Sequence, residues 1–296
     1  MFLVDIGNSG LRACKITCEG RKEFDFAKIS SPVFKLSWSS IGQEISKHRK
    51  PPDTSEHRRW THIDDDQGYD WLVHQVTHLK ASKDHSPWRI ASVNRKALDR
   101  LLCAIDKNAK RSDRHDSNPL QIVNRRSVGI NIQVDYPDKV GIDRLLAAKA
   151  AIHWSEIQGL DKPLIVVQAG TALTVDWVDS QRRFQGGSIL PGVGLALQYL
   201  AAGTDQLPWL PTDSIDRLPR LPGKNTEEAI AAGVHASLVG GVRYLVERYR
   251  AEDAQSGQAP VVISGGDGRL VLEHIPAPAT YIDNLVLLGL SLCDPS

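Results

Sequence analysis

The chain lacks the features that mark several classes of protein. Its 296 residues include four cysteines, and no second cysteine or histidine pair follows Cys14 and Cys18 at the spacing of a zinc site. Its 36 basic and 35 acidic side chains nearly cancel, which argues against a nucleic-acid or membrane partner. No run approaches the ~18 apolar residues that span a bilayer, and Asp5 stands where a signal peptide would be apolar. We therefore expect a cytoplasmic protein without disulfides, in which Cys14 and Cys18 pack in a core.

Two short loops of the same design lie in the two halves of the chain. They are VDIGNSGLR, from Val4 to Arg12, and VQAGTALTVD, from Val167 to Asp176. In each, an apolar run ends at a polar residue, turns on a glycine, meets a hydroxyl and resumes as a strand. The backbone N–H groups at the tip of such a hairpin can bind phosphate oxygens, although an ordinary Asx turn would look the same. The repetition suggests two related domains that hold one nucleotide.

The apolar pattern predicts an α/β protein of two similar halves, because strands followed by helices occur twice. We place the domains at 1–156 and 157–296. The first half is expected to hold a β-meander over 1–30, helices at 69–79, at 95–105 and from about 142, strands at 88–93 and 121–123, and an exposed loop at 106–119. The second is expected to hold strands at 164–168, 172–178, 184–189 and 261–264, and helices from about Pro191, over 226–249, capped by Thr226–Glu228, and from about Asp283.

Five glycine-containing motifs then occur in a specific order. They are Asp5–Ser9 (DIGNS), Gly141–Arg144 (GIDR), Gly170–Asp176 (GTALTVD), Gly186–Gly192 (GGSILPG) and Gly223–Thr226 (GKNT). With these motifs the chain resembles the type III pantothenate kinases of the acetate kinase/sugar kinase/Hsp70/actin superfamily, from residue 1 to about residue 290 and most weakly over 31–118. The resemblance implies two similar actin-like (ribonuclease H-like) α/β domains with the active site in the cleft between them. A P-loop lysine motif is absent, which excludes the P-loop type of pantothenate kinase.

The resemblance implies ATP-dependent phosphorylation of pantothenate to 4′-phosphopantothenate, the first step of coenzyme A biosynthesis. Asp5 would hold Mg²⁺, through water, beside the ATP phosphates, and Gly265–Gly266 resembles the turn on the adenosine side. The residues that the resemblance assigns to ATP are Asp5, Ile6, Gly7, Asn8, Ser9, Gly10, Leu11, Arg12 and Thr171.

On the substrate side, the resemblance makes Asp143 the general base for the primary hydroxyl of pantothenate. Arg144 presents a fork that suits the carboxylate of such a substrate. Read alone, Asp143 and Arg144 could merely begin a helix, and Thr226 could be only a helix cap. The residues that the resemblance assigns to pantothenate are Tyr136, Gly141, Ile142, Asp143, Arg144 and Thr226.

One position departs from the family pattern. The family usually has an aspartate where this chain has Gln168, and that aspartate helps to bind a monovalent cation, K⁺ or NH₄⁺. Because glutamine offers an oxygen but no charge, the sequence puts this cation site in doubt.

Family resemblance also implies a homodimer. The small residues Ala231, Ala232, Ala236 and Gly240 would allow close packing of the helix at 226–249, although a helix buried within one chain would look the same. Two other functions stay open: a non-catalytic accessory or regulatory relative, and a superfamily kinase with another small-molecule substrate, against which Tyr136-Pro137 beside Asp143-Arg144 argues.

Overall fold

The computed structural model of the chain describes residues 1–8, 10–16, 34–37, 61–62, 87–111, 120–215, 219–252 and 258–293. Ser9, Cys18 and the helix expected at 69–79 lie outside the described residues. The chain divides into two compact units, Met1–Asn124 and Arg125–Asp294.

The first unit is built on a sheet with the strand order β4-β3-β2-β1-β5-β6. Strands β1, β2 and β3 are antiparallel neighbours, whereas β5 runs parallel to β1 and β6 runs parallel to β5. The first two strands of the expected meander and the strands near 88 and 121 are confirmed, whereas the third strand expected before residue 30 lies outside the described residues and the strand next to β2 is at 34–37. The strands span Phe2–Ile6 (β1), Gly10–Lys15 (β2), Phe34–Ser37 (β3), Thr61–His62 (β4), Trp88–Ser92 (β5) and Leu120–Ile122 (β6).

Helix α2 (Arg95–Arg111) packs its apolar side, with Ala97, Leu101 and Ala104 buried, on this sheet. It continues through residues that the sequence analysis assigned to an exposed loop at 106–119, so that assignment was wrong for 106–111. The physical reason is that lysine and arginine are good helix formers when exposed, so a polar segment can extend an amphipathic helix.

The second unit repeats the topology of the first. Its sheet has the order β11-β10-β7-β8-β9. Strands β7, β8 and β9 form an antiparallel meander, and β10 and β11 are added in parallel next to β7. In chain order this is the pattern of β1, β2, β3, β5 and β6, so the duplication predicted from the two loops is confirmed. The strands span Leu164–Ala169 (β7), Ala172–Val178 (β8), Phe184–Pro191 (β9), Val261–Ser264 (β10) and Ala279–Tyr281 (β11).

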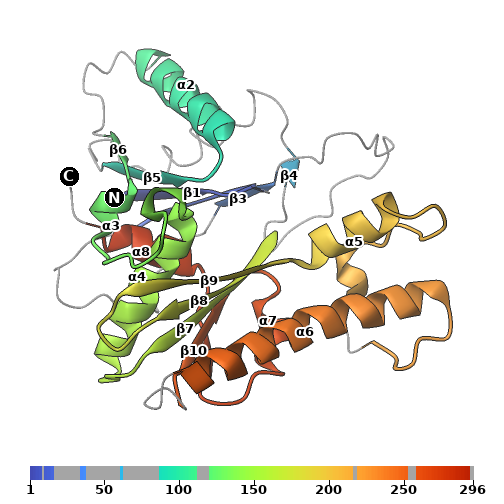
Figure 1. The fold of residues 1–296 in the computed structure, drawn as a ribbon. Coiled ribbons are helices and arrows are strands. Elements are labelled where there is room, and N and C mark those ends of the chain that lie inside the picture. The colour runs from blue at the N-terminus through green and yellow to red at the C-terminus, as the bar shows by residue number, and fades with distance from the viewer. Residues whose placement is uncertain are drawn as a thin grey trace. The chain divides into compact units, whose positions relative to one another are not determined.

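Helices cover both faces of this second sheet (Figure 1). Helices α4 and α8 pack together on one face, and α6 and α7 lie on the other. The helical segments span Arg125–Val128 (α3), Pro137–Lys139 (η2), Ile142–Ile157 (α4), Val193–Ala202 (α5), Thr212–Ile215 (η3), Thr226–Glu252 (α6), Gly268–Leu272 (α7) and Leu285–Ser291 (α8).

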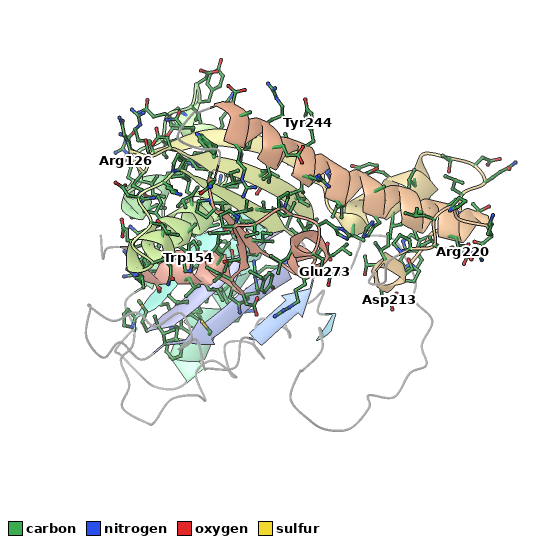
Figure 2. All side chains as sticks on the ribbon, turned by 90° about the horizontal axis from the view of Figure 1, so that it is seen from below. Arg126, Trp154, Asp213, Arg220, Tyr244 and Glu273 are labelled. Atoms are coloured by element: carbon green, nitrogen blue, oxygen red, sulfur yellow. The ribbon has the colours of Figure 1, made fainter. Side chains whose placement is uncertain are left out.

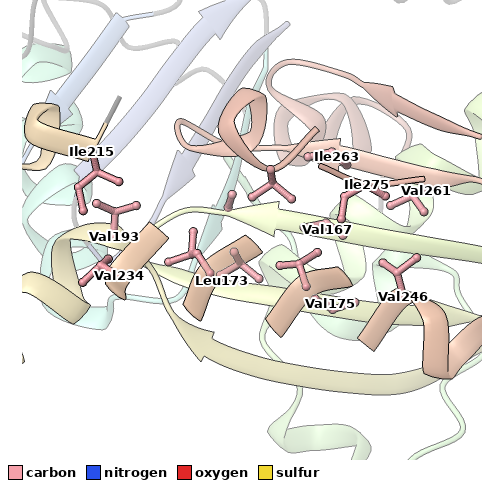
Figure 3. Packing of buried hydrophobic residues seen from close by; sticks show 14 of the residues in the cluster. Val167, Leu173, Val175, Val193, Ile215, Val234, Val246, Val261, Ile263 and Ile275 are labelled. Carbon is pink, nitrogen blue, oxygen red and sulfur yellow. The ribbon is translucent and has the colours of Figure 1, made fainter. Parts of the chain in front are cut away.

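The main core of the second unit lies between the sheet and α6. Figure 3 shows Val167 and Val175 of the sheet packed near Val246 of the helix. Side chains alternate along a strand, so Gln168 and Asp176, which directly follow Val167 and Val175, point to the opposite face of the sheet. There both contact α4. This alternation places polar side chains beneath the first turn of α4.

Helix α4 belongs to the second unit, although the predicted boundary near residue 156 put it in the first domain. It packs against α8, β7 and β8, so the chain divides after Asn124 instead. The alanine- and leucine-rich pattern of α4 predicts a buried helix, but it carries no information about which sheet the helix covers.

The start of α5 and the capping residue of α6 differ from the expectation, whereas α6 begins at Thr226 as predicted. Pro191 ends β9 and α5 begins at Val193, after an extended Gly192. At α6 the cap is Asn225 rather than Thr226: its Oδ1 accepts a hydrogen bond from the N–H of Glu228 at 2.8 Å, and Glu228 Oε2 accepts one from the N–H of Lys224 at 2.7 Å. These two bonds satisfy the N–H of Glu228 in the first turn and the N–H of Lys224 just before the helix.

Helix α6 is also long and apolar enough, with a mean hydropathy of 1.4 over its most apolar window, to pass a composition test for a membrane span. From the sequence, no such segment was expected. In the structure its residues Ile230, Val234, Leu238 and Val242 are buried in the core, as expected for the central helix of a packed unit. Tyr244 projects from its exposed side (Figure 2).

Cys14 is buried in β2, as the packing role predicted for it requires. Burial raises the pKa of the Cys14 thiol to about 12, so it stays protonated and unreactive.

Candidate functional site

The first glycine loop joins β1 to β2 in the first unit. The N–H of Gly7 donates to the carbonyl of Gly10 at 2.8 Å and closes the turn. Asp5, near the end of β1, lies directly opposite Arg12 of β2, whose Nη2 donates to Asp5 Oδ2 at 2.9 Å. The Asp5 side chain is buried, whereas its partner Arg12 is more exposed. The guanidinium of Arg12 partly balances the charge of the Asp5 carboxylate.

The other residues predicted to bind ATP in this loop differ in exposure. Asn8 is exposed at the tip, and Gly7 and Gly10 are half-buried. Ile6 and Leu11 are buried in the core, so they could reach a nucleotide only through their backbone groups. Ser9 lies outside the described residues, and its predicted contact stays a prediction.

The second loop, between β7 and β8, repeats the first. The N–H of Gly170 donates to the carbonyl of Ala172 at 3.3 Å, and Thr171 is exposed at the tip. Gln168 stands two residues before Gly170, as Asp5 stands two residues before Gly7. The duplicated topology therefore makes Gln168 the counterpart of Asp5.

Two glycines hold the tip of this second loop through backbone packing. A Cβ atom at Gly192 would clash with the carbonyl oxygen of Gly170, and one at Gly265 would clash with that of Ala169. Gly265 also has a φ of +100°, which L-residues rarely adopt. The N–H of Gly192 donates to the carbonyl of Thr171 at 3.0 Å. These contacts fix the turn that carries the predicted ATP threonine.

The predicted base, Asp143, lies in the first turn of α4. Gly141 precedes the helix in an extended conformation, and Ile142 is buried beneath it. The half-buried carboxylate of Asp143 accepts a hydrogen bond from the N–H of Arg144, at 2.9 Å from Oδ1. A Cβ atom at Gly141 would lie 2.5 Å from the same oxygen, so a side chain there would push the carboxylate out of this position.

Arg144 is held by a buried aspartate of the neighbouring sheet. Its Nε donates to Oδ1 of Asp176 at 3.0 Å, and its Nη2 donates to the same oxygen. The guanidinium also lies over the ring of Phe184, 5.5 Å from the ring centroid. Burial raises the pKa of Asp176 to about 6, while the hydrogen bonds and the charge of Arg144 lower it and the negative charge of Asp143 raises it further.

Gln168 also contacts this turn. Its Nε2 donates to the backbone carbonyl of Asp143, at a long 3.4 Å. Two neighbouring strands thus contact two successive residues of α4, with Gln168 at Asp143 and Asp176 at Arg144.

The remaining substrate-side predictions concern exposed residues. Tyr136 is exposed before η2, with the ammonium of Lys139 4.5 Å from its ring centroid. Thr226 is exposed as the first residue of α6. The structure brings Gly141, Ile142, Asp143, Arg144 and Gln168 together, whereas contacts of Tyr136 and Thr226 with a substrate stay predictions.

Asp176 is the functional candidate that the sequence analysis did not select. It belongs to the quoted Gly170–Asp176 motif, and a charged residue within the apolar strand sequence Leu173–Val178 (LTVDWV) was the available signal. Gly187, its partner on β9, has no room for a side chain, because a Cβ atom there would lie 2.5 Å from Asp176 Oδ1.

A cavity of about 360 Å³ lies in the second unit and shares Gly187 with the surroundings of Asp176. It does not involve the predicted base, and it is lined by Trp177, Asp179, Gln185, Gly186, Gly187, Tyr249 and Glu252. Within the part of the chain that the structure describes, no group of three or more histidine, cysteine or acidic side chains could hold a metal by itself.

The duplicated sheets define a two-domain α/β protein of the actin-like class. A solved structure with a similar fold is that of a conserved Baf family protein from Campylobacter jejuni, with a TM-score of 0.52 and 16% identity, covering 98% of this chain and 96% of that one. At this identity the likeness concerns the fold alone.

Sequence comparison identifies the family. The family model of type III pantothenate kinases matches residues 35–248. The type III pantothenate kinase of Rhodopirellula baltica is 38% identical over 208 residues, which are 70% of each chain. Those of Albidiferax ferrireducens and Brevibacillus brevis are 34% and 36% identical, each over 55% of this chain and over 61% and 60% of their own lengths. The chain belongs to the type III pantothenate kinase family, as the resemblance predicted.

Proposed function

We propose that the protein transfers the γ-phosphoryl group of ATP to the primary hydroxyl of pantothenate. The product would be 4′-phosphopantothenate, and the reaction would be the first step of coenzyme A biosynthesis. The observation that carries this proposal is the set of contacts that position the turn of Asp143. A glycine makes room for its carboxylate, and Gln168 and Asp176 support the turn on which it lies.

Asp143 would act as the general base. Phosphoryl transfer depends mainly on positioning and charge neutralisation, and it needs one group to accept the proton of the attacking hydroxyl. Arg144 would approach the carboxylate of pantothenate while Asp176 holds its Nε and Nη2. Tyr136 and Thr226 are exposed and available for further substrate contacts.

Asp5 fits the Mg²⁺ that accompanies ATP. Mg²⁺ in nucleotide sites is commonly bound by one or two carboxylates, phosphate oxygens and water, and Asp5 is a buried carboxylate beside a turn with an exposed tip. Its pairing with Arg12 keeps the charge balanced before a metal arrives. The metal would supply charge neutralisation of the phosphates.

A monovalent cation does not fit position 168 in the way that the family suggests. The residue has no charge. Its amide N–H also donates to the carbonyl oxygen of Asp143, which is therefore not free to bind a cation there. We infer that this enzyme depends less on K⁺ or NH₄⁺ than its relatives with an aspartate.

The partners that we propose are ATP and pantothenate, with a second copy of the chain as a homodimer. A nearly neutral net charge of +1 gives no reason to add nucleic acid or a membrane, and we place the protein in the cytoplasm.

The test is ADP release by the purified protein with Mg²⁺–ATP, in the presence of pantothenate and in the absence of an acceptor. Pantothenate-dependent ADP release with formation of a phosphorylated product supports the proposal. Release that is the same with and without pantothenate, or that appears only with another small alcohol, contradicts it in favour of a different substrate. The absence of release under all conditions points to a non-catalytic relative.

A further inference from the structure

Asp176 is an acid in a position where strands normally carry apolar side chains. It has no exposed surface, and its neighbours in the adjacent strands are Val166 of β7 and Gly187 of β9. Burying a charge is costly unless it is paired and hydrogen-bonded. Its partner, Arg144, comes from α4. The buried charge of Asp176 is therefore compensated by an ion pair between the sheet and the helix.

A buried ion pair is a weak explanation for stability. Well-packed apolar residues of similar volume often stabilise a protein as well or better, whereas removal of one partner leaves an uncompensated buried charge. The presence of Asp176 and Arg144 therefore suggests a role beyond packing. What distinguishes this pair is its position, because Arg144 directly follows Asp143 in the chain.

The contacts connect the pair to the carboxylate of Asp143. The guanidinium of Arg144 is fixed by Asp176, and the backbone N–H of the same arginine donates to Asp143 Oδ1 at 2.9 Å. The ion pair thus anchors α4 to the sheet at the residue whose backbone N–H contacts this carboxylate.

We propose that Asp176 is a positioning residue that orients the Asp143 carboxylate by holding Arg144 against the sheet. Asp176 acts through Arg144, and the inference rests on the proposed role of Asp143 as the base. Gly187 contributes by leaving the space that Asp176 occupies.

The charge state of Asp176 offers a specific readout. Burial raises its pKa to about 6, so it loses its negative charge when the pH falls below this value. Among the described residues, the charged groups that act on it are Arg144 and Asp143 of α4, while its neighbours on β7 and β9 are uncharged. The ion pair between Asp176 and Arg144 should therefore weaken as the pH falls through about 6, and kcat with pantothenate should fall with it.

The experiment compares Asp176→Asn with Asp179→Asn in the full-length protein. Asp179 also pairs with an arginine, Arg183 at 2.7 Å, but that pair lies within the β8–β9 hairpin and does not involve α4. In steady-state assays with pantothenate and ATP, Asp176→Asn should lower kcat on the order of tenfold or more, less than loss of a general base would. KM for ATP should be unchanged. The acid limb of the kcat profile near pH 6 should be present in the unmodified protein and in Asp179→Asn, and missing from Asp176→Asn.

A second measurement does not depend on activity. Amide hydrogen exchange over residues 141–146 should be faster in Asp176→Asn than in the unmodified protein and unchanged in Asp179→Asn. If Asp176→Asn does not fold, Arg144→Lys, which keeps the charge but loses the planar fork, should show the same faster exchange.

The outcomes separate this inference from the proposed function. If the unmodified protein does not phosphorylate pantothenate, the proposed function fails, and exchange over 141–146 still tests whether Asp176 holds this turn. If kcat, the acid limb and the exchange rates of folded Asp176→Asn all match those of Asp179→Asn, the pair is only structural and the inference is overturned.

Discussion

Asp143 lies at the start of α4 with one carboxylate oxygen bound to the N–H of Arg144. Replacement by asparagine keeps the size of the side chain and an oxygen for this hydrogen bond, but it removes the ability to accept a proton. We expect Asp143→Asn to lower kcat with pantothenate by ~10²–10⁴-fold, the range for a general base. Steady-state kinetics and a melting curve on the purified variant check this. A near-normal rate in the folded variant would refute the assignment of Asp143 as the base.

Asp5 is expected to act on the nucleotide side alone. Asp5→Ala removes a buried carboxylate and leaves Arg12 without that partner. We expect kcat/KM for Mg²⁺–ATP to fall on the order of tenfold or more, since a hydrogen bond to a charged group is worth ~1.5–3 kcal/mol. Pantothenate binding should be unchanged. Separate calorimetric titrations of the two ligands decide this, and an unchanged affinity and rate with ATP would reduce the first loop to a simple turn.

Gln168 predicts a weak response to monovalent cations. Rates should be similar in potassium, ammonium, sodium and lithium salts at constant ionic strength. Gln168→Asp should respond more strongly, because it restores one negative charge to the site. It also loses the N–H that donates to the carbonyl of Asp143, so Gln168→Ala serves as the control that loses this contact without gaining charge. Strong activation of the unmodified protein by potassium would show that other groups build a cation site.

At the scale of single residues, the sequence predicted the residues that belong to motifs but not how they contact each other. The motif Gly141–Arg144 identified Asp143 and Arg144, and the departure at Gln168 was visible without a structure. Asp176 was not selected, because its partner is a helix residue from another part of the chain. Which strand residues face α4 is decided by the packing of the sheet.

Among the elements, α6 provides a test of helix capping. Asn225, not Thr226, supplies the side-chain cap, through the N–H of Glu228. We expect Asn225→Ala to lower the free energy of unfolding by about 1 kcal/mol, the typical value for a lost N-cap. Thr226→Ala should change stability less, and it should raise KM for pantothenate if Thr226 contacts the substrate. Urea denaturation of both variants measures the difference, and equal losses would contradict the assignment of the cap.

The elements that the sequence predicted are those with a long or strongly apolar pattern. Strand β10 has the expected bounds, and the strands of the second meander and helix α6 differ from expectation by at most a few residues. Helix α7 and strand β11 were not expected, because five and three residues are too few to show a period. The start of α5 was misplaced because Pro191, which often begins a helix, here ends an edge strand, where a proline costs no ladder hydrogen bond.

For the whole molecule, duplication was the property best predicted from sequence. Two similar loops predicted two similar domains, and the matching strand orders of the two sheets follow from them. The predicted boundary near residue 156 differs from the observed division after Asn124, because α4 precedes the second sheet in the chain yet packs on it. A helix can cover a sheet that follows it as easily as one that precedes it, and only tertiary contacts distinguish the two.

The interface of the proposed homodimer can be assigned to one face of α6. Of the small residues that suggested this interface, Ala231 and Ala232 are buried in the core of their own unit, whereas Ala236 and Gly240 are exposed. Tyr244 follows them at helical spacing and is 62% exposed. Residues four apart lie on the same side of a helix, so these three share one face.

Sedimentation equilibrium should therefore give a mass near twice 32.6 kDa. Tyr244→Glu should shift the equilibrium toward the monomer, because a charge on an apolar contact face must lose its hydration when the copies associate. Tyr199→Glu is the matched control, since Tyr199 is similarly exposed, at 66%, but lies on α5. If the unmodified chain sediments as a monomer, the homodimer is refuted, and if both variants dissociate equally, the interface extends beyond this face of α6.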